Sequence, residues 1–323
     1  MTFVEYFPRI NTTNIYTNIC DIDEFSVVDG MLTISNQKYP ILLTHNVKNY
    51  TSCVSDGPNG KIIRLRDASE RSETEDVEYT WTAKELQLHH YIKCNSCNCE
   101  LIDISQLRKV LPMPSEMWNE MVDFWHCHKP NGSEVITKRF NGLKPGHNGV
   151  LVGPYYFIFN PEDFKTIKVQ ENDVGCSNCD YLLGSKDENF GCYKLLKWRV
   201  SLDDDHFEKW RYIYFKLIEE VKFTGTHKFT LVCGDKYLKV WCFSLGIEFV
   251  TKNIKYNNGM KILYDEAEER KDGEYIIEIE YVDVFEDFIK ILRRSNEILK
   301  SYGLDNFGKW KVGYIGDIKS GND

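Results

Sequence analysis

The sequence predicts an α+β protein that is mainly antiparallel β, with a zinc-stapled central region and a C-terminal α+β part. Short apolar or alternating runs, separated by turn residues, recur along much of the chain, which is typical of antiparallel strands. Apolar residues at helical spacing are confined to a few stretches. Two Cys-x-x-Cys pairs have the spacing of zinc knuckles.

The first 66 residues predict a series of antiparallel strands. The runs FVEYFPRI, MLTIS, YPILLT and KIIRLR are separated by turn residues, and Asn59-Gly60 before KIIRLR is the sharpest hairpin signal. Residues 67–78 then carry six acidic residues against one arginine. We expect a solvated loop there, with a partner-binding role as the alternative.

Residues 78–94 have a strand-like pattern that runs into the first cysteine pair, and residues 150–160 predict a buried strand interrupted at Gly153-Pro154. Between them, residues 115–128 predict a central helix with one broad apolar stripe that begins at Ser115, an N-cap residue type, and stops before Pro130. An ordinary core helix is one interpretation of this stripe. The other is that the helix binds a partner or supports the metal site through Trp118, Trp125, His126, Cys127 and His128.

The pattern changes near residue 200, which predicts a β-rich region over residues 1–200 and a C-terminal α+β region over residues 201–323. Asp205, with Glu208 three residues later, predicts the start of a helix. FTLVC and KYLKVWCFSLGIEFV predict a hairpin around Gly234-Asp235. Residues 282–300 predict a final helix with Gly303 just beyond its end.

The strongest chemical signal is the set of four cysteines Cys94, Cys97, Cys176 and Cys179. They lie in two similar sequence segments, CNSCNCELI and CSNCDYLLG, and this similarity favours two matching zinc knuckles within residues 94–184. Four thiolates leave zinc no open position for water, so the expected site is structural. Cys99, His126, Cys127 and His128 could replace one ligand or form a second site. A redox role is disfavoured because neither pair lies at a βα turn that would lower a thiol pKa.

Composition narrows the classes of function. The net charge is −9 and no run is rich in Lys or Arg, so we expect no direct binding of nucleic acid, and an RNA-contacting zinc module is the least favoured alternative. No apolar run is long enough to cross a membrane, and the first residues do not have the pattern of a signal peptide. We therefore expect a protein of the cytoplasm and nucleus. Phosphate loops and the HExxH and GxSxG motifs are absent.

Residues 94–184 resemble the HECT-like proteins that bind ubiquitin-conjugating enzymes, and most closely their fungal members tied to pre-mRNA cleavage and polyadenylation. The likeness rests on PSEMWNEMVDFWHCHKP, LVGPYYFIF and the paired knuckles, the second of which runs on to LLG. Such knuckles are often followed by Gly, where this chain has Asn98 and Asp180.

The resemblance implies that the protein binds a ubiquitin-conjugating enzyme and binds or stabilises the endonuclease of the pre-mRNA 3′-end machinery. The alternative that it implies is a ubiquitin-protein ligase. Such a ligase would form a ubiquitin thioester, and Cys127 or Cys192 would then be our candidate acceptors. HECT ligases keep their acceptor cysteine close to the C-terminus, whereas the last cysteine here is Cys242. We therefore assign no catalytic residue.

Overall fold

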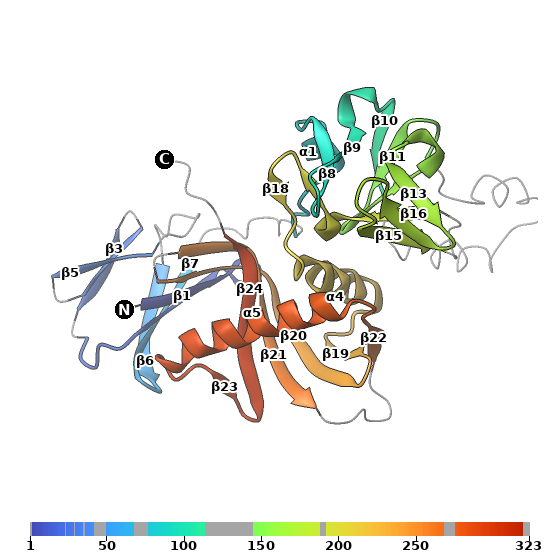
Figure 1. Cartoon of the computed structure of the whole chain (residues 1–323). Helices are drawn as coiled ribbons and strands as arrows, with labels where there is room; N and C mark the ends of the chain where they lie inside the picture. Colours follow the sequence, from blue (N-terminus) through green and yellow to red (C-terminus); the bar gives the residue numbers. More distant parts are fainter. Residues whose placement is uncertain are drawn as a thin grey trace, which may run out of the picture. The chain divides into compact units, whose positions relative to one another are not determined.

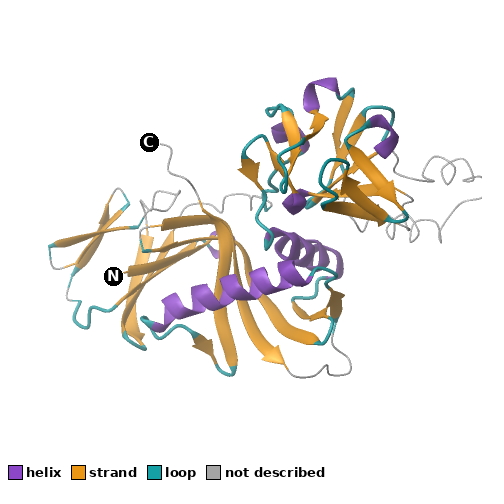
Figure 2. Ribbon diagram, viewed as in Figure 1, coloured by secondary structure: helices purple, strands orange, loops and turns teal. Residues whose placement is uncertain are grey.

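Figure 1 shows the chain as a computed structural model. It describes residues 2–22, 24–28, 30–34, 36–41, 50–67, 77–113, 145–187, 192–252, 254–267 and 275–318. Most of the described elements are antiparallel strands, joined by a few helices, which confirms the predicted α+β class (Figure 2). None of the described helices is long and apolar enough to cross a membrane.

The chain forms two compact units that do not follow the expected division at residue 200. The first unit contains residues 1–78 and 226–323, and the second contains residues 79–225. Residue 200 lies inside the second unit, where Val200 pairs with Cys94 in an antiparallel ladder. The physical reason is strand pairing. Strands from both ends of the chain share one sheet in the first unit, whereas the strands of residues 79–225 pair with one another.

The first unit is built on a ten-stranded sheet with the order β23-β24-β21-β20-β1-β2-β7-β6, and β19, which pairs with β20 and β22, lies off this path. The N-terminal strand β1 pairs with both β2 and β20, which joins the two ends of the chain. The strands are β1 (Thr2–Phe7), β2 (Thr12–Thr17), β6 (Tyr50–Gly57), β7 (Gly60–Asp67), β19 (Lys228–Cys233), β20 (Lys236–Thr251), β21 (Ile254–Ala267), β22 (Ile276–Glu278), β23 (Asn306–Phe307) and β24 (Trp310–Ile318).

A small sheet, a long helix and a short 3-10 turn complete the first unit. A three-stranded sheet of β3 (Phe25–Val28), β4 (Met31–Ile34) and β5 (Gln37–Pro40) contributes Val27, Leu32 and Ile34 to a core shared with β1, β2 and β7. Helix α5 (Val282–Lys300) packs on β24, and a short 3-10 turn, η1 (Pro8–Ile10), joins β1 to β2. The hairpins at Asn59-Gly60 and Gly234-Asp235 and the final helix confirm those predictions.

The second unit contains two sheets. Its four-stranded sheet has the order β18-β17-β8-β9, and its seven-stranded sheet has the order β10-β11-β12-β16-β15-β14-β13. The strands are β8 (Tyr91–Cys94), β9 (Glu100–Asp103), β10 (Lys109–Pro112), β11 (Gly149–Val152), β12 (Tyr156–Phe159), β13 (Ile167–Gln170), β14 (Asp173–Cys176), β15 (Leu182–Asp187), β16 (Cys192–Leu196), β17 (Val200–Leu202) and β18 (Asp205–His206). The helical elements are α1 (Ala83–Leu86), η2 (Ile104–Gln106), η3 (Pro161–Asp163), η4 (Lys197–Arg199) and α4 (Arg211–Thr224).

Two local predictions in this unit are wrong. Residues 78–94 are not one strand, because Thr82 and Glu85 form a capping box that starts α1 before β8 begins. The helix expected from Asp205 begins at Arg211 instead, because Asp205 lies in β18 and accepts a hydrogen bond from Trp81 Nε1 (2.7 Å). The central helix expected over residues 115–128 lies outside the described residues.

A buried carboxylate joins the strands of the first unit. Glu5 is 1% exposed and accepts hydrogen bonds from Asn14 Nδ2 (3.0 Å), the Tyr16 hydroxyl (2.6 Å), the Tyr314 hydroxyl and Lys261 Nζ (3.0 Å). Burial alone raises the pKa of Glu5, but Lys261 and the neutral donors outweigh burial and hold it below its ordinary value. Four donors from three other strands thus keep one buried charge satisfied.

In the second unit, a buried lysine side chain makes a similar set of hydrogen bonds. Lys197 is 0% exposed, and its Nζ donates to the carbonyl oxygens of Thr80 (3.1 Å), Trp81 (3.0 Å) and Pro154 (3.3 Å). Burial lowers the pKa of Lys197 well below its usual value. Three carbonyls match the three donors of an ammonium group, so this side chain connects the start of the unit to the turn between β11 and β12.

We predict that Glu5→Gln lowers the free energy of unfolding by about 3 kcal/mol near pH 7, because it leaves Lys261 without its ionic partner. A depressed folded-state pKa means that the stabilisation from Glu5 is complete above the unfolded-state pKa of about 4.3 and is lost as the pH falls through the folded-state value. Urea unfolding should therefore show a constant difference between wild type and variant above about pH 5, and a shrinking difference below about pH 4. The exposed Glu24→Gln is the control, and a difference that does not change with pH would refute the assignment.

Candidate metal centre

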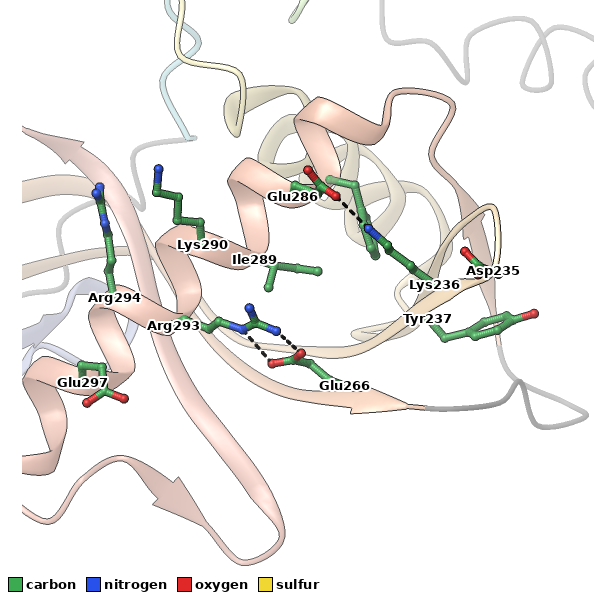
Figure 3. A pocket seen from close by; sticks show the side chains of 11 residues that line it. Asp235, Lys236, Tyr237, Glu266, Glu286, Ile289, Lys290, Arg293, Arg294 and Glu297 are labelled. Atoms are coloured by element: carbon green, nitrogen blue, oxygen red, sulfur yellow. Dashed lines mark hydrogen bonds and ion pairs between the residues drawn. The ribbon is translucent and has the colours of Figure 1, made fainter.

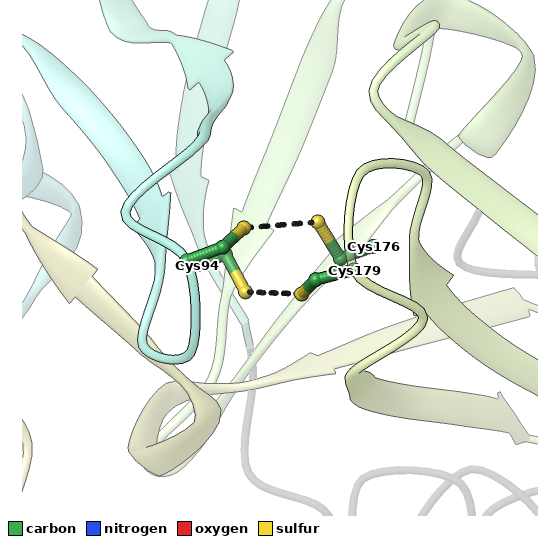
Figure 4. A group of neighbouring side chains, drawn as sticks. Cys94, Cys176 and Cys179 are labelled. Atoms are coloured by element: carbon green, nitrogen blue, oxygen red, sulfur yellow. Dashed lines mark hydrogen bonds between the residues drawn. The ribbon is translucent and has the colours of Figure 1, made fainter.

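The structure brings together the four cysteines that the spacing selected. Cys94 ends β8 and Cys176 ends β14, while Cys97 and Cys179 lie in the turns that follow. The Sγ atoms of Cys94 and Cys179 are 3.8 Å apart, those of Cys97 and Cys176 are 3.7 Å apart, and all four lie within 4.8 Å of one another (Figure 4). Zn–S bonds of about 2.3 Å in a tetrahedron give S···S edges of about 3.8 Å. The cluster therefore fits a tetrahedral metal ion.

The two turns have the same backbone hydrogen bonds. In the first, the Cys94 N–H donates to the Cys99 carbonyl (2.9 Å) and the Asn98 N–H donates to the Cys94 carbonyl (2.9 Å). In the second, the Cys176 N–H donates to the Tyr181 carbonyl and the Asp180 N–H to the Cys176 carbonyl, both at 3.0 Å. The similar sequence of the two pairs therefore folds into equivalent turns, each between two strands of a hairpin.

Each turn ends on a left-handed residue. Asn98 has φ 55° and Asp180 has φ 60°, and both directly follow the second cysteine of their pair. Glycine enters this region without strain, and Asn and Asp are the side chains that tolerate it best. Asn98 and Asp180 thus keep the turn geometry at the positions where related knuckles often have glycine.

Burial differs between the two cysteines of each pair. Cys94 and Cys176 are buried, whereas Cys97 is half-buried and Cys179 is exposed. Burial raises the pKa of Cys94 to about 12 and also raises that of Cys176. Donation from the Asn178 side chain and the Cys99 backbone lowers the pKa of Cys97 to about 6. A bound cation would supply the charge that keeps the buried sulfurs as thiolates.

Residues of η4 connect the two turns. The backbone carbonyl of Arg199 accepts a hydrogen bond from the Asn95 N–H (3.2 Å) in the first turn. The side chain of Arg199 donates through Nη1 to the Tyr181 hydroxyl (3.1 Å) beside the second turn. The Trp198 carbonyl accepts from Asn95 Nδ2 (3.1 Å). No sequence pattern predicted these contacts, because they depend on strand pairing that brings residues 95 and 199 together.

The other predicted site residues are not described as part of this cluster. Trp118, Trp125, His126, Cys127 and His128 lie outside the described residues. Cys99 Sγ donates to the Glu100 carbonyl (3.6 Å) and is not part of the four-sulfur group. Over the part of the chain that the structure describes, no second group of His, Cys, Asp or Glu side chains is placed to hold a metal.

Three further thiols are buried in the cores of the two units. Cys192, Cys233 and Cys242 are 3%, 4% and 0% exposed. Burial raises the pKa of Cys233, and it raises that of Cys242 to about 12. A thiol acts as a nucleophile through its thiolate, so these positions favour inert core thiols.

A separate groove of 690 Å³ lies in the first unit beside α5 (Figure 3). Two pairs of oppositely charged side chains lie in its lining: Arg293 Nε donates to Glu266 Oε1 (3.0 Å), and Lys236 Nζ lies 2.7 Å from Glu286 Oε1. Most of the described lining residues are charged. The described lining residues are Asp235, Lys236, Tyr237, Glu266, Phe285, Glu286, Ile289, Lys290, Arg293, Arg294 and Glu297.

Comparison with known proteins places these features in a family. Residues 5–312 match the family model described as HECT-like Ubiquitin-conjugating enzyme (E2)-binding. An uncharacterised protein of Saccharomyces cerevisiae is 28% identical over 96% of this chain and 97% of its own length. An E3 ubiquitin-protein ligase of Rattus norvegicus is 32% identical over 92 residues, which cover 28% of this chain and 23% of that protein. No solved structure shows a significant match.

The left-handed turn residues give a direct test of the knuckle geometry. We predict that Asn98→Gly keeps the stability of the second unit, whereas Asn98→Val lowers it by about 1–2 kcal/mol, because a β-branched side chain is strained at positive φ. Chemical unfolding of both variants measures this difference. Equal stabilities for the Gly and Val variants would show that the turn does not require the left-handed conformation.

Proposed function

This chain belongs to the HECT-like ubiquitin-conjugating enzyme (E2)-binding family, and from that premise we propose that it is a zinc-stabilised protein that binds a ubiquitin-conjugating enzyme. The observation that carries the proposal is the family match over residues 5–312, which includes residues of both units. The similarity to ubiquitin-protein ligases of Rattus norvegicus and Mus musculus supports the same partner. The chain's net charge of −9 favours a protein partner over a nucleic acid.

Zinc is the metal that the cysteine cluster favours. A tetrahedral set of four thiolates selects zinc or an iron–sulfur cluster, and two matching Cys-x-x-Cys turns are a common structural zinc site. When bound, the ion would neutralise the thiolates of Cys94, Cys97, Cys176 and Cys179 and link the β8–β9 and β14–β15 hairpins. All four positions would be filled by protein, so its role would be stability.

We also propose that the protein supports pre-mRNA 3′-end cleavage and polyadenylation by binding or stabilising the endonuclease of that machinery, in the cytoplasm and nucleus. The support is the resemblance of residues 94–184 to the fungal family members tied to that process. Depletion of the protein should reduce the level of the endonuclease and the cleavage of reporter transcripts. Unchanged endonuclease and cleavage after depletion would reject this role.

The alternative is a ubiquitin-protein ligase that forms a thioester. In that reaction a thiolate of this chain attacks the thioester carbonyl of the charged conjugating enzyme, and the enzyme's own cysteine leaves as thiolate. The names of the two rodent relatives, both ubiquitin-protein ligases, favour ligase activity. The burial of Cys192 and Cys242 opposes a thioester at those two positions, and Cys127 lies outside the described residues.

We predict that a single-turnover assay with ubiquitin-charged conjugating enzyme shows binding of the enzyme without a ubiquitin adduct on this chain. Gel analysis with and without reductant separates a thioester from an amide-linked product. A reductant-sensitive adduct on the chain would support the ligase alternative, and its loss in Cys127→Ser or Cys192→Ser would identify the acceptor.

We predict that Cys94→Ser loses zinc and unfolds the second unit, because metal binding contributes folding free energy on the order of 10 kcal/mol in small zinc domains. Elemental analysis of the purified protein and its melting temperature report the two effects. The control is Cys53→Ser, which removes an exposed thiol of the first unit. Unchanged metal content and melting temperature in Cys94→Ser would contradict the site.

A further inference from the structure

Four aromatic side chains form a connected surface in the first unit, which we call the aromatic patch. Trp241 and Phe243 come from β20, Phe307 from β23 and Trp310 from β24. The ring centroids are 5.5 Å apart for Trp241 and Phe243, 6.4 Å for Trp241 and Trp310, and 6.1 Å for Phe243 and Phe307. Contacts this close hold the rings as one cluster.

The patch is exposed on a rigid support. Phe243 is 44% exposed and Phe307 is 55% exposed. Phe307 pairs with Trp310 across the β23–β24 hairpin, and Gly308 takes the left-handed conformation (φ 60°) that its tight turn requires. Trp241 and Trp310 are half-buried and pack against the core, so they support the two exposed rings from below. Exposed rings on strands fixed by pairing are typical of surfaces that bind other proteins.

Two lysines lie over the tryptophan rings of the patch. Lys228 Nζ is 4.2 Å from the Trp241 ring centroid, and Lys309 Nζ is 5.8 Å from that of Trp310. Neither ammonium group has a carboxylate partner among the described residues, whereas Lys261, near Phe243, is paired with Glu5. In a chain of net charge −9, this apolar surface therefore carries two cations that are not neutralised.

The arrangement favours a protein partner over single-stranded nucleic acid. Stacked bases need open ring faces, and here the lysines lie over the faces of both tryptophans. The rings also meet at steep angles, 68° for Trp241 with Phe243 and 72° for Trp241 with Trp310, so they form no parallel platform. The complementary surface has apolar side chains flanked by carboxylates.

We propose that the aromatic patch is the docking surface for the ubiquitin-conjugating enzyme, which contacts it through apolar side chains flanked by carboxylates. This inference rests on the proposed function, since that function names the partner. All four rings lie within residues 5–312, the region that matches the E2-binding family. The groove beside α5 is the competing surface, but Lys236 and Arg293, two of its four basic lining residues, are already paired with Glu286 and Glu266.

The test compares matched variants of the full chain against a panel of purified ubiquitin-conjugating enzymes, with Kd measured by calorimetry. Phe307→Ser removes an exposed ring of the patch, and Val28→Ser, at a residue 61% exposed in β3, is its apolar control. Lys228→Glu reverses a patch charge, and Lys290→Glu does the same beside the groove. We expect the two patch variants to weaken binding about tenfold or more, and the two controls to stay within about twofold of wild type.

The outcomes separate this inference from the proposed function. If wild type binds no enzyme of the panel, the proposed function fails and the docking inference fails with it. If wild type binds but the patch variants bind equally well, only the docking inference is overturned. A loss of binding confined to Lys290→Glu would show that the enzyme docks at the groove instead. A patch variant that changes only the oligomeric state, measured by light scattering, would instead make the patch a contact between copies of this chain. Because these residues are exposed, unchanged melting temperatures are expected for all four variants.

Discussion

The second unit depends on the meeting of four cysteine sulfurs. Cys97 and Cys176 are far apart in the sequence, yet their Sγ atoms lie 3.7 Å apart because β8 and β14 end at the same place. Four thiolates at this spacing repel one another unless a cation lies between them. The hairpins, the left-handed residues after each pair and the η4 contacts together place the four sulfurs where one metal ion could bind.

In the first unit, the buried charge that must be satisfied is the ionised carboxylate of Glu5. Glu5 is buried where strands from both ends of the chain meet, and its donors come from β2, β21 and β24. This network uses the charge of Lys261 internally. Lys228 and Lys309 have no such partner among the described residues, so the aromatic patch carries positive charge that is available to a binding partner.

These two features lead to a consistent picture of function. The family match and the ligase relatives point to a partner of the ubiquitin system. Cys192, Cys233 and Cys242 are buried, and burial raises the pKa of Cys233 and Cys242. A scaffold whose four clustered cysteines could hold a metal ion, with an aromatic patch in the first unit, suits recognition of a conjugating enzyme better than covalent transfer through the core cysteines.

The sequence by itself determined the features that depend on neighbouring residues. The turn at Asn59-Gly60, the helix over residues 282–300 and the choice of Cys94, Cys97, Cys176 and Cys179 as one set follow from local propensity or ligand spacing. Tertiary structure alone decided the division into two units, the donors to Glu5 and the assembly of Trp241, Phe243, Phe307 and Trp310. These depend on pairing between strands far apart in the chain, such as β1 with β20 and β8 with β17. Strand pairing of that kind leaves no periodic signal in the sequence, so only the folded chain shows which side chains meet.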